Sequence, residues 1–297
     1  MSLDWHTRYQ SQRPADWTLR HLTEADLPAA AALSAQLGWP YTAQDFARLL
    51  AWTPQGCFCV EEPERGVVGV VTTTLYGRVL GWLGLLIVAE DRRGRGLGRR
   101  LARAALDFLI AAEADCIMAH ANDAARALYR ALGFRVRDRV ERWEGRASTY
   151  LGPRARRLRP AEIEVVLALD EELTQLPRAH MLRHLLVEFP KLAWVDIQRE
   201  QIEGYLLGRQ LGRTVHLGPW LSWSAAGAER LLRTALEQLQ GQHVVLHIPS
   251  YNGRGLILAD NHNLRRTVTV ARMVYGNMRP PTAQPLTELA PLSLATG

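Results

Sequence analysis

The most constraining feature of this 297-residue chain is a glycine-rich junction between an apolar run and an amphipathic segment. Residues 79–89 are apolar enough to predict a buried strand, and residues 97–108 repeat leucine and alanine at helical spacing. Gly94, Gly96 and Gly98 lie between them and allow positive φ and the close approach of a ligand. Because the first turn of a helix has free N–H groups and its dipole favours anions, the junction predicts a phosphate site.

Two other nucleotide-binding motifs can be tested on the same residues. A dinucleotide fingerprint requires G-x-G-x-x-G, but Arg99 stands where the third glycine should be. A P-loop ends in Gly-Lys followed by Ser or Thr, whereas Gly98 is followed by two arginines. Two plainer interpretations stay open: the glycines form an ordinary tight turn, and the neighbouring arginines form a solvated face.

A second strand-to-helix junction lies at residues 116–134. Residues 116–119 predict a short buried strand, and Asn122 or Asp123 is a natural N-cap for the helix that follows. Gly133 is a suitable terminator of that helix. Tyr129 lies about two helical turns after Asn122, so the two side chains share one face.

The two junctions, in this order and on a strand–helix–strand–helix frame, resemble the GCN5-related N-acetyltransferase (GNAT) superfamily. The matching residues are Arg93-x-x-Gly96-x-Gly98, followed by Asn122, Leu128-Tyr129 and Gly133-Phe134. The resemblance covers residues 17–151 and implies an α/β fold with a mixed (α+β) sheet.

The resemblance also implies a cofactor and a set of site residues. The donor would be acetyl-CoA, bound as a co-substrate, with no metal ion. Its pyrophosphate and pantetheine arm would contact Leu86, Ile87, Val88, Arg93, Gly94, Arg95, Gly96, Leu97, Gly98, Arg99 and Asn122. Tyr129 would be the catalytic residue, giving a proton to the departing CoA thiolate. A simple helix cap for Asn122 and a packed core aromatic for Tyr129 are the alternatives.

The general base stays unassigned. Many members of the superfamily carry a glutamate on the fourth strand, but residues 81–88 contain no carboxylate. Glu61 and Glu62, near the end of a neighbouring strand, are candidate substitutes, and a surface pair is the plainer account of them.

The second half of the chain repeats the first with weaker motifs. The correspondences are Gly69 with Gly204, Gly77 with Gly212, Asn122 with Asn252 and Tyr129 with Ala259. Ser222 or Ser224 stands near the place of the glycine loop, and either could cap the helix and leave amides free for a phosphate. We therefore expect two tandem GNAT-like (acyl-CoA N-acyltransferase) domains, the second one divergent.

The expected organisation has four parts. Residues 1–152 form the N-terminal GNAT domain, 153–160 a linker, 161–278 the divergent C-terminal domain and 279–297 a proline-rich tail. The tail has little periodicity, so we expect it to be irregular or to lie over the surface. The second domain would cover one side of the acceptor cleft, with lining candidates His180, His184, Trp194, Tyr205, Trp220 and Trp223.

The charge balance agrees with an anionic cofactor. The net charge is +6 and the pI about 9.6, with nearly all of the basic residues being arginine. The densest basic run, 153–160, has prolines near both ends and no stacking aromatics, which favours a linker over a nucleic-acid arm. Three cysteines and no apolar run of ~20 residues predict neither a disulfide framework nor a membrane span. Without a signal peptide pattern, we expect a cytoplasmic protein.

The resemblance thus implies an N-acetyltransferase that moves an acetyl group from acetyl-CoA to a primary amine by direct attack in a ternary complex. The amine acceptor is a small molecule or a peptide, and no motif in the chain identifies it. No motif indicates the preferred acyl chain length or the oligomeric state. Two alternatives stay open: a non-catalytic acyl-CoA-binding or regulatory protein, and an Arg-rich nucleic-acid-binding protein.

Overall fold

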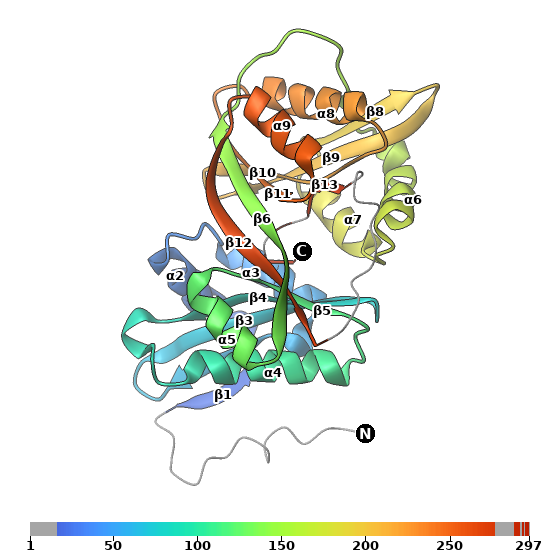
Figure 1. The fold of residues 1–297 in the computed structure, drawn as a ribbon. Coiled ribbons are helices and arrows are strands. Elements are labelled where there is room, and N and C mark those ends of the chain that lie inside the picture. The colour runs from blue at the N-terminus through green and yellow to red at the C-terminus, as the bar shows by residue number, and fades with distance from the viewer. Residues whose placement is uncertain (1–16, 277–287, 292, 294, 297) are drawn as a thin grey trace.

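A computed structural model describes residues 17–276, 288–291, 293 and 295–296, which form a mixed α/β fold on one continuous sheet (Figure 1). The first half contributes the strands β1 (Thr18–His21), β2 (Phe58–Glu62), β3 (Gly66–Tyr76), β4 (Leu80–Val88), β5 (Ile117–Ala121) and β6 (Phe134–Arg146). The second half contributes β7 (Arg156–Arg157), β8 (Ala193–Gln198), β9 (Gln201–Leu211), β10 (Thr214–Ser222), β11 (His243–Pro249), β12 (Arg265–Tyr275) and β13 (Glu288–Ala290).

The helices alternate with these strands in the same order in both halves. The first half has α2 (Leu27–Gln36), α3 (Ala43–Trp52), α4 (Leu97–Ala111) and α5 (Asp123–Ala131), and the second has α6 (Ile163–Thr174), α7 (Ala179–Glu188), α8 (Ala225–Gln238) and α9 (Gly253–Asn261). The repeated order confirms the prediction of two tandem domains of one fold. Among the described residues, no helix is both long and apolar enough to cross a membrane.

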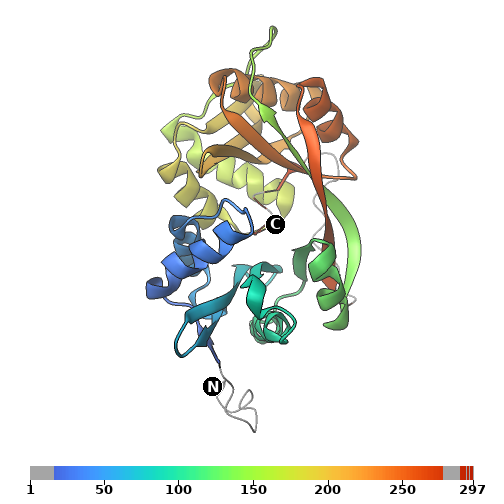
Figure 2. The same ribbon diagram turned by 90° about the vertical axis from the view of Figure 1, so that its left-hand side faces the viewer.

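The two halves exchange their last strands at the centre of the sheet. The strand order is β1-β2-β3-β4-β5-β12-β6-β11-β10-β9-β8-β7, with β13 added beside β10. Thus β6 pairs with β11 of the second half, β12 pairs with β5 of the first half, and β6 and β12 pair with each other, all antiparallel. Both views show β6 and β12 running side by side from one half into the other (Figures 1 and 2).

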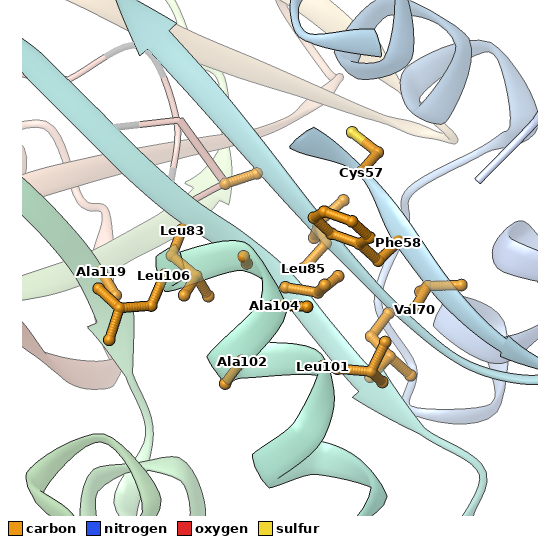
Figure 3. Packing of buried hydrophobic residues seen from close by; sticks show 14 of the residues in the cluster. Cys57, Phe58, Val70, Leu83, Leu85, Leu101, Ala102, Ala104, Leu106 and Ala119 are labelled. Atoms are coloured by element: carbon orange, nitrogen blue, oxygen red, sulfur yellow. The ribbon is translucent and has the colours of Figure 1, made fainter. Parts of the chain in front are cut away.

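The core of the first half is built on the apolar face of α4. Leu101, Ala102, Ala105, Leu106 and Leu109 recur at helical spacing and are fully buried. Figure 3 shows this face against side chains of β2, β3 and β4, among them Phe58, Val70, Leu83 and Leu85. The amphipathic pattern after the glycines therefore anchors the start of α4 beside the end of β4.

The two halves meet through an apolar cluster and ion pairs. Tyr76, Trp82 and Met118 on the first half pack with Leu176 and Met181 on the second. Across the same boundary Arg48 on α3 donates to Glu188 on α7 at 2.6 Å. A buried side chain network of Asp170, Arg178 and Tyr205 stiffens the second half close by.

Two segments of the second half differ from the sequence-based expectation. Within the expected linker, Arg156–Arg157 form β7 and pair with β8. The expectation that the tail lies on the surface is wrong for its described residues, because β13 pairs with β10 and Leu289, Ala290, Ser293, Ala295 and Thr296 are buried. Tyr76 of the first half donates to the Thr296 carbonyl at 2.6 Å, so Thr296 lies against the first half. Edge pairing, which needs no periodicity, accounts for its burial.

A chain that ends at residue 152 is expected not to fold. Its β6 would lack both of its neighbours, and β5 would present an open edge where β12 belongs. We expect aggregation and no cooperative thermal transition, measured by size-exclusion chromatography and circular dichroism beside the full chain. A monomeric fragment with a sharp transition would show that the exchange is dispensable.

Candidate active site

The candidate site begins where β4 separates from β5. The two parallel strands pair only at Gly81–Leu83 with Ile117–Ala119. Just beyond, Leu85 has φ 39° and the β3–β4 register shifts, so that two residues of β4 face one of β3. Such a bulge bends a strand. Leu86, Ile87 and Val88 therefore have no ladder partner on the β5 side within the described sheet.

The start of α4 lies at the end of this opening and is left uncapped. Gly96, the N-cap residue, has φ 82°, and Gly94 has φ 78°, a region that glycine enters without strain. Gly96 offers no side chain to the helix, and the first backbone bond is donated by Arg100 to the Gly96 carbonyl. The N–H groups of residues 97–99 are thus free to bind an anion.

The arginines near this helix end fall into two groups. Arg92 is bound to Glu62 at 2.8 and 2.9 Å, and Arg100 lies over the Trp17 ring at 4.9 Å. Arg95 and Arg99 are exposed and have no ion-pair partner among the described residues, while Arg93 makes one 3.4 Å bond to the Val88 carbonyl. The arginines predicted from the motif are the ones left available to a ligand.

The two acidic residues considered as bases are already engaged. Glu61 accepts from Arg20 at 2.8 Å, and Glu62 accepts from Arg92. These ion pairs tie β2 to its neighbours, which agrees with a structural role for both carboxylates.

Asn122 precedes α5 and Tyr129 lies on it. Leu128 of the same helix lies beside the start of α4. Asn122 is exposed and its Oδ1 accepts from the Ala125 N–H at 2.9 Å, so it is the predicted N-cap. Tyr129 is 2% exposed and packs on Phe134, with ring centroids 5.3 Å apart. Its hydroxyl makes no hydrogen bond within the described part of the chain. Burial raises the pKa of this phenol, so it stays protonated at neutral pH.

Comparison with known proteins decides the family. Residues 19–134 match the acetyltransferase (GNAT) family, and residues 166–286 match a second acetyltransferase (GNAT) domain. The chain is 35% identical over 125 residues to the N-alpha-acetyltransferase RimI of Mycobacterium tuberculosis, covering 39% of this chain and 77% of that protein.

The chain belongs to the GNAT family. The tandem architecture also recurs in solved structures. A Pyrococcus horikoshii protein proposed to be an acetyltransferase superposes with a TM-score of 0.79 at 20% identity, over 98% of this chain and 100% of its own. A GCN5-related N-acetyltransferase from Sphaerobacter thermophilus gives 0.67 at 18% identity, over 92% and 99%. At these identities the likeness concerns the fold.

The second GNAT half fills the places that are open in the first. At the start of α8, Ser224 accepts from the Gly227 N–H at 3.0 Å. The buried Asp196 carboxylate lies beside the same turn and is held by Arg230 at 2.6 and 2.8 Å. Where β10 parts from β11, the chain's own β13 pairs with Trp220 and Leu221. In the second half, the Asp196 carboxylate thus lies where the first half leaves room for an anion. The strand β13 lies where the first half leaves an unpaired strand edge.

The residues expected to line the acceptor cleft differ in their burial. Trp194, Tyr205 and Trp220 are core residues with no exposed surface, while His180, His184 and Trp223 are exposed. A pocket between the halves is instead lined by Tyr41 and Arg209, which sequence reasoning missed. The available signal for Arg209 was a charge inside an otherwise apolar strand.

Proposed function

We propose that this GNAT protein transfers an acetyl group from acetyl-CoA to a primary amine, and that the first half binds the donor. The observation that carries the proposal is the uncapped start of α4 at the end of an open β4–β5 cleft. The free amides of residues 97–99 suit a pyrophosphate, as do Arg95 and Arg99, which form no ion pair with the described residues. The second half has both places filled from within its own chain.

The remaining donor contacts follow the cleft. The unpaired edge of Leu86, Ile87 and Val88 can bind the amide-rich pantetheine arm as an added strand. Arg93 would support the pyrophosphate from the other side of the turn. Asn122 uses its Oδ1 as a helix cap, which leaves its Nδ2 group free to donate to the arm. The Val88 N–H would stabilise negative charge on the acetyl oxygen.

Bond exchange then requires one proton donor and one acceptor. The amine nitrogen attacks the acetyl carbon, the carbon–sulfur bond breaks, and Tyr129 gives its proton to the sulfur. The high pKa of the buried phenol keeps that proton in place until charge develops on sulfur. The attacking nitrogen loses one proton to solvent or to a base that we leave unassigned, and the Tyr129 phenolate regains a proton from solvent. Positioning in a ternary complex supplies the rest of the acceleration.

The site count tests the division of labour between the halves. Because Ser224 and Asp196 already occupy the start of α8, calorimetric titration of acetyl-CoA should give one site per chain. Release of CoA thiol on addition of amines should then report turnover. Two equivalent sites would show that the second half also binds the donor, and no site at all would refute the acetyltransferase proposal.

The nature of the acceptor is open to two classes. Similarity to a protein named for N-alpha acetylation supports a peptide amino terminus. The pocket between the halves, lined by residues of both, supports a small amine.

A further inference from the structure

The pocket between the halves adjoins the point where the acetyl group would arrive. Its lining includes Tyr41, Trp52, Arg209 and Thr296. Next to Thr296, the Ala295 carbonyl lies against Gly84, at a distance that a Cβ on Gly84 would not allow. Gly84 immediately precedes the bulge at which β4 opens. An acceptor in this pocket would therefore face the end of the pantetheine arm.

One arginine of the pocket is compensated within the protein. Arg48 donates to Glu188 at 2.6 Å and also pairs with the buried Asp45. Both carboxylate oxygens of Asp45 are engaged, since the second one accepts from the backbone and hydroxyl of Thr42. Each of these three charged groups thus has a partner of opposite charge within the described protein.

Arg209, by contrast, forms no ion pair with any of the described residues. It lies on β9 and is 6% exposed, and within the described part of the chain its Nε and Nη2 have no hydrogen-bond partner. The guanidinium stands beside the Tyr41 hydroxyl, which is neutral at physiological pH because burial raises its pKa. A buried charge without a counter-ion is strongly unfavourable unless a ligand supplies one.

The neighbours of Arg209 offer no anion either. His216 lies opposite Arg209 in the β9–β10 ladder. The His247 ring lies next to the His216 ring, and the centroids of these two rings are 5.4 Å apart. Burial lowers the pKa of both imidazoles well below 6.5, so they are neutral at pH 7. Arg142, the next cation, is bound to Glu144 at 2.7 and 3.1 Å. Asp45 lines the same pocket, but no carboxylate of the described residues forms an ion pair with Arg209.

We propose that Arg209 binds a carboxylate of the amine acceptor, so that the substrate class is small amino acids or other amino carboxylates. The inference rests on the proposed acetyl transfer. The planar guanidinium fork suits a carboxylate through two parallel bonds, and burial strengthens them. Arg209 would thus be a specificity-determining residue that the second half contributes to a reaction centred on the first.

The kinetic test uses matched acceptor pairs. CoA release is measured with glycine and glycinamide, β-alanine and β-alaninamide, and γ-aminobutyrate and its amide, with phosphoethanolamine and ethanolamine added. We expect the wild type to prefer the carboxylates, and Arg209→Gln to lower kcat/KM for the best one at least tenfold, chiefly through KM. The same variant should leave the amides unaffected, and Arg209→Lys should recover part of the loss. Arg213→Gln, on the exposed β9–β10 turn, is the matched control.

A binding test is independent of turnover. Arg209→Met removes an uncompensated charge, so its thermal midpoint should equal or exceed that of the wild type, whereas loss of a structural arginine would lower it. The preferred amino carboxylate should raise the midpoint of the wild type and not that of the variant. Equal use of carboxylates and amides, no midpoint shift with any carboxylate, or a preference for phosphoethanolamine would overturn the proposal.

The proposed acetyl transfer and the proposed role of Arg209 can fail separately. Arg209→Gln should bind acetyl-CoA as the wild type does, because the residue lies outside the donor cleft. If the wild type binds and uses acetyl-CoA but ignores the carboxylate, the inference about Arg209 fails alone. If acetyl-CoA does not bind, the proposed function itself fails.

Discussion

Gly98→Glu is expected to weaken acetyl-CoA binding at least 100-fold, which is about 2.7 kcal/mol, while the fold stays intact. The new carboxylate would lie in the first turn of α4, among the amides that we assign to the pyrophosphate, and would neutralise the helix end. Loss of two charge-assisted hydrogen bonds accounts for an effect of this size. The change should be tolerated structurally, because a Cβ on Gly98 meets Leu128 and Val88 at ordinary distances of 3.5 and 3.6 Å.

Calorimetry with acetyl-CoA measures the effect, and Gly253→Glu is its matched control. Gly253 is the first residue of α9, and a Cβ there meets nothing within 4 Å. The control should bind acetyl-CoA like the wild type. Undiminished affinity in Gly98→Glu would move the donor away from α4 and with it the whole site.

Tyr129→Phe is expected to lower kcat about 100- to 1000-fold with little change in acetyl-CoA affinity. Removal of a positioned general acid has an effect of this order. The ring would keep its packing on Phe134, and the lost hydroxyl has no hydrogen bond within the described protein, so stability should not fall. Steady-state kinetics of CoA release and a donor titration measure the two quantities.

Tyr275→Phe provides the comparison for Tyr129. Tyr275 also packs on Phe134, with centroids 5.5 Å apart, but lies on β12 rather than on α5. Its variant should keep full kcat. Wild-type turnover in Tyr129→Phe would make that residue a core aromatic, and turnover absent from every form would favour a non-catalytic acyl-CoA-binding protein.

Local features of the site could be predicted because local sequence determines them. Two residues before α4 have positive φ, a conformation that favours glycine. The position before α5 is a helix N-cap, where asparagine is among the preferred residues, and Asn122 occupies it. The tandem organisation could also be predicted, because equivalent turns in the two halves require the same residue types. All of these interactions span only a few positions of the chain.

The features that could not be predicted depend on distant partners. The alternating pattern of β6 would suit pairing with β12 of the other half as well as with a strand of its own. Arg209 stands out only once Tyr41, His216 and the pocket are placed around it. Ala290 is buried because β13 pairs with β10, and Thr296 is buried because it contacts Tyr76 of the first half. No periodicity in the tail sequence indicates either contact.

The exchanged strands also set an order of events during synthesis. β5 is complete at Ala121, but the strand that covers its edge begins only at Arg265. At ~5–20 residues per second, ribosomes would need roughly 7–30 s to make the intervening segment. Throughout that time the nascent first half exposes an unpaired edge, a template for wrong pairing between chains on a crowded polysome. Slow translation or a shortage of chaperones should therefore reduce the yield of this protein more than that of a single-domain relative.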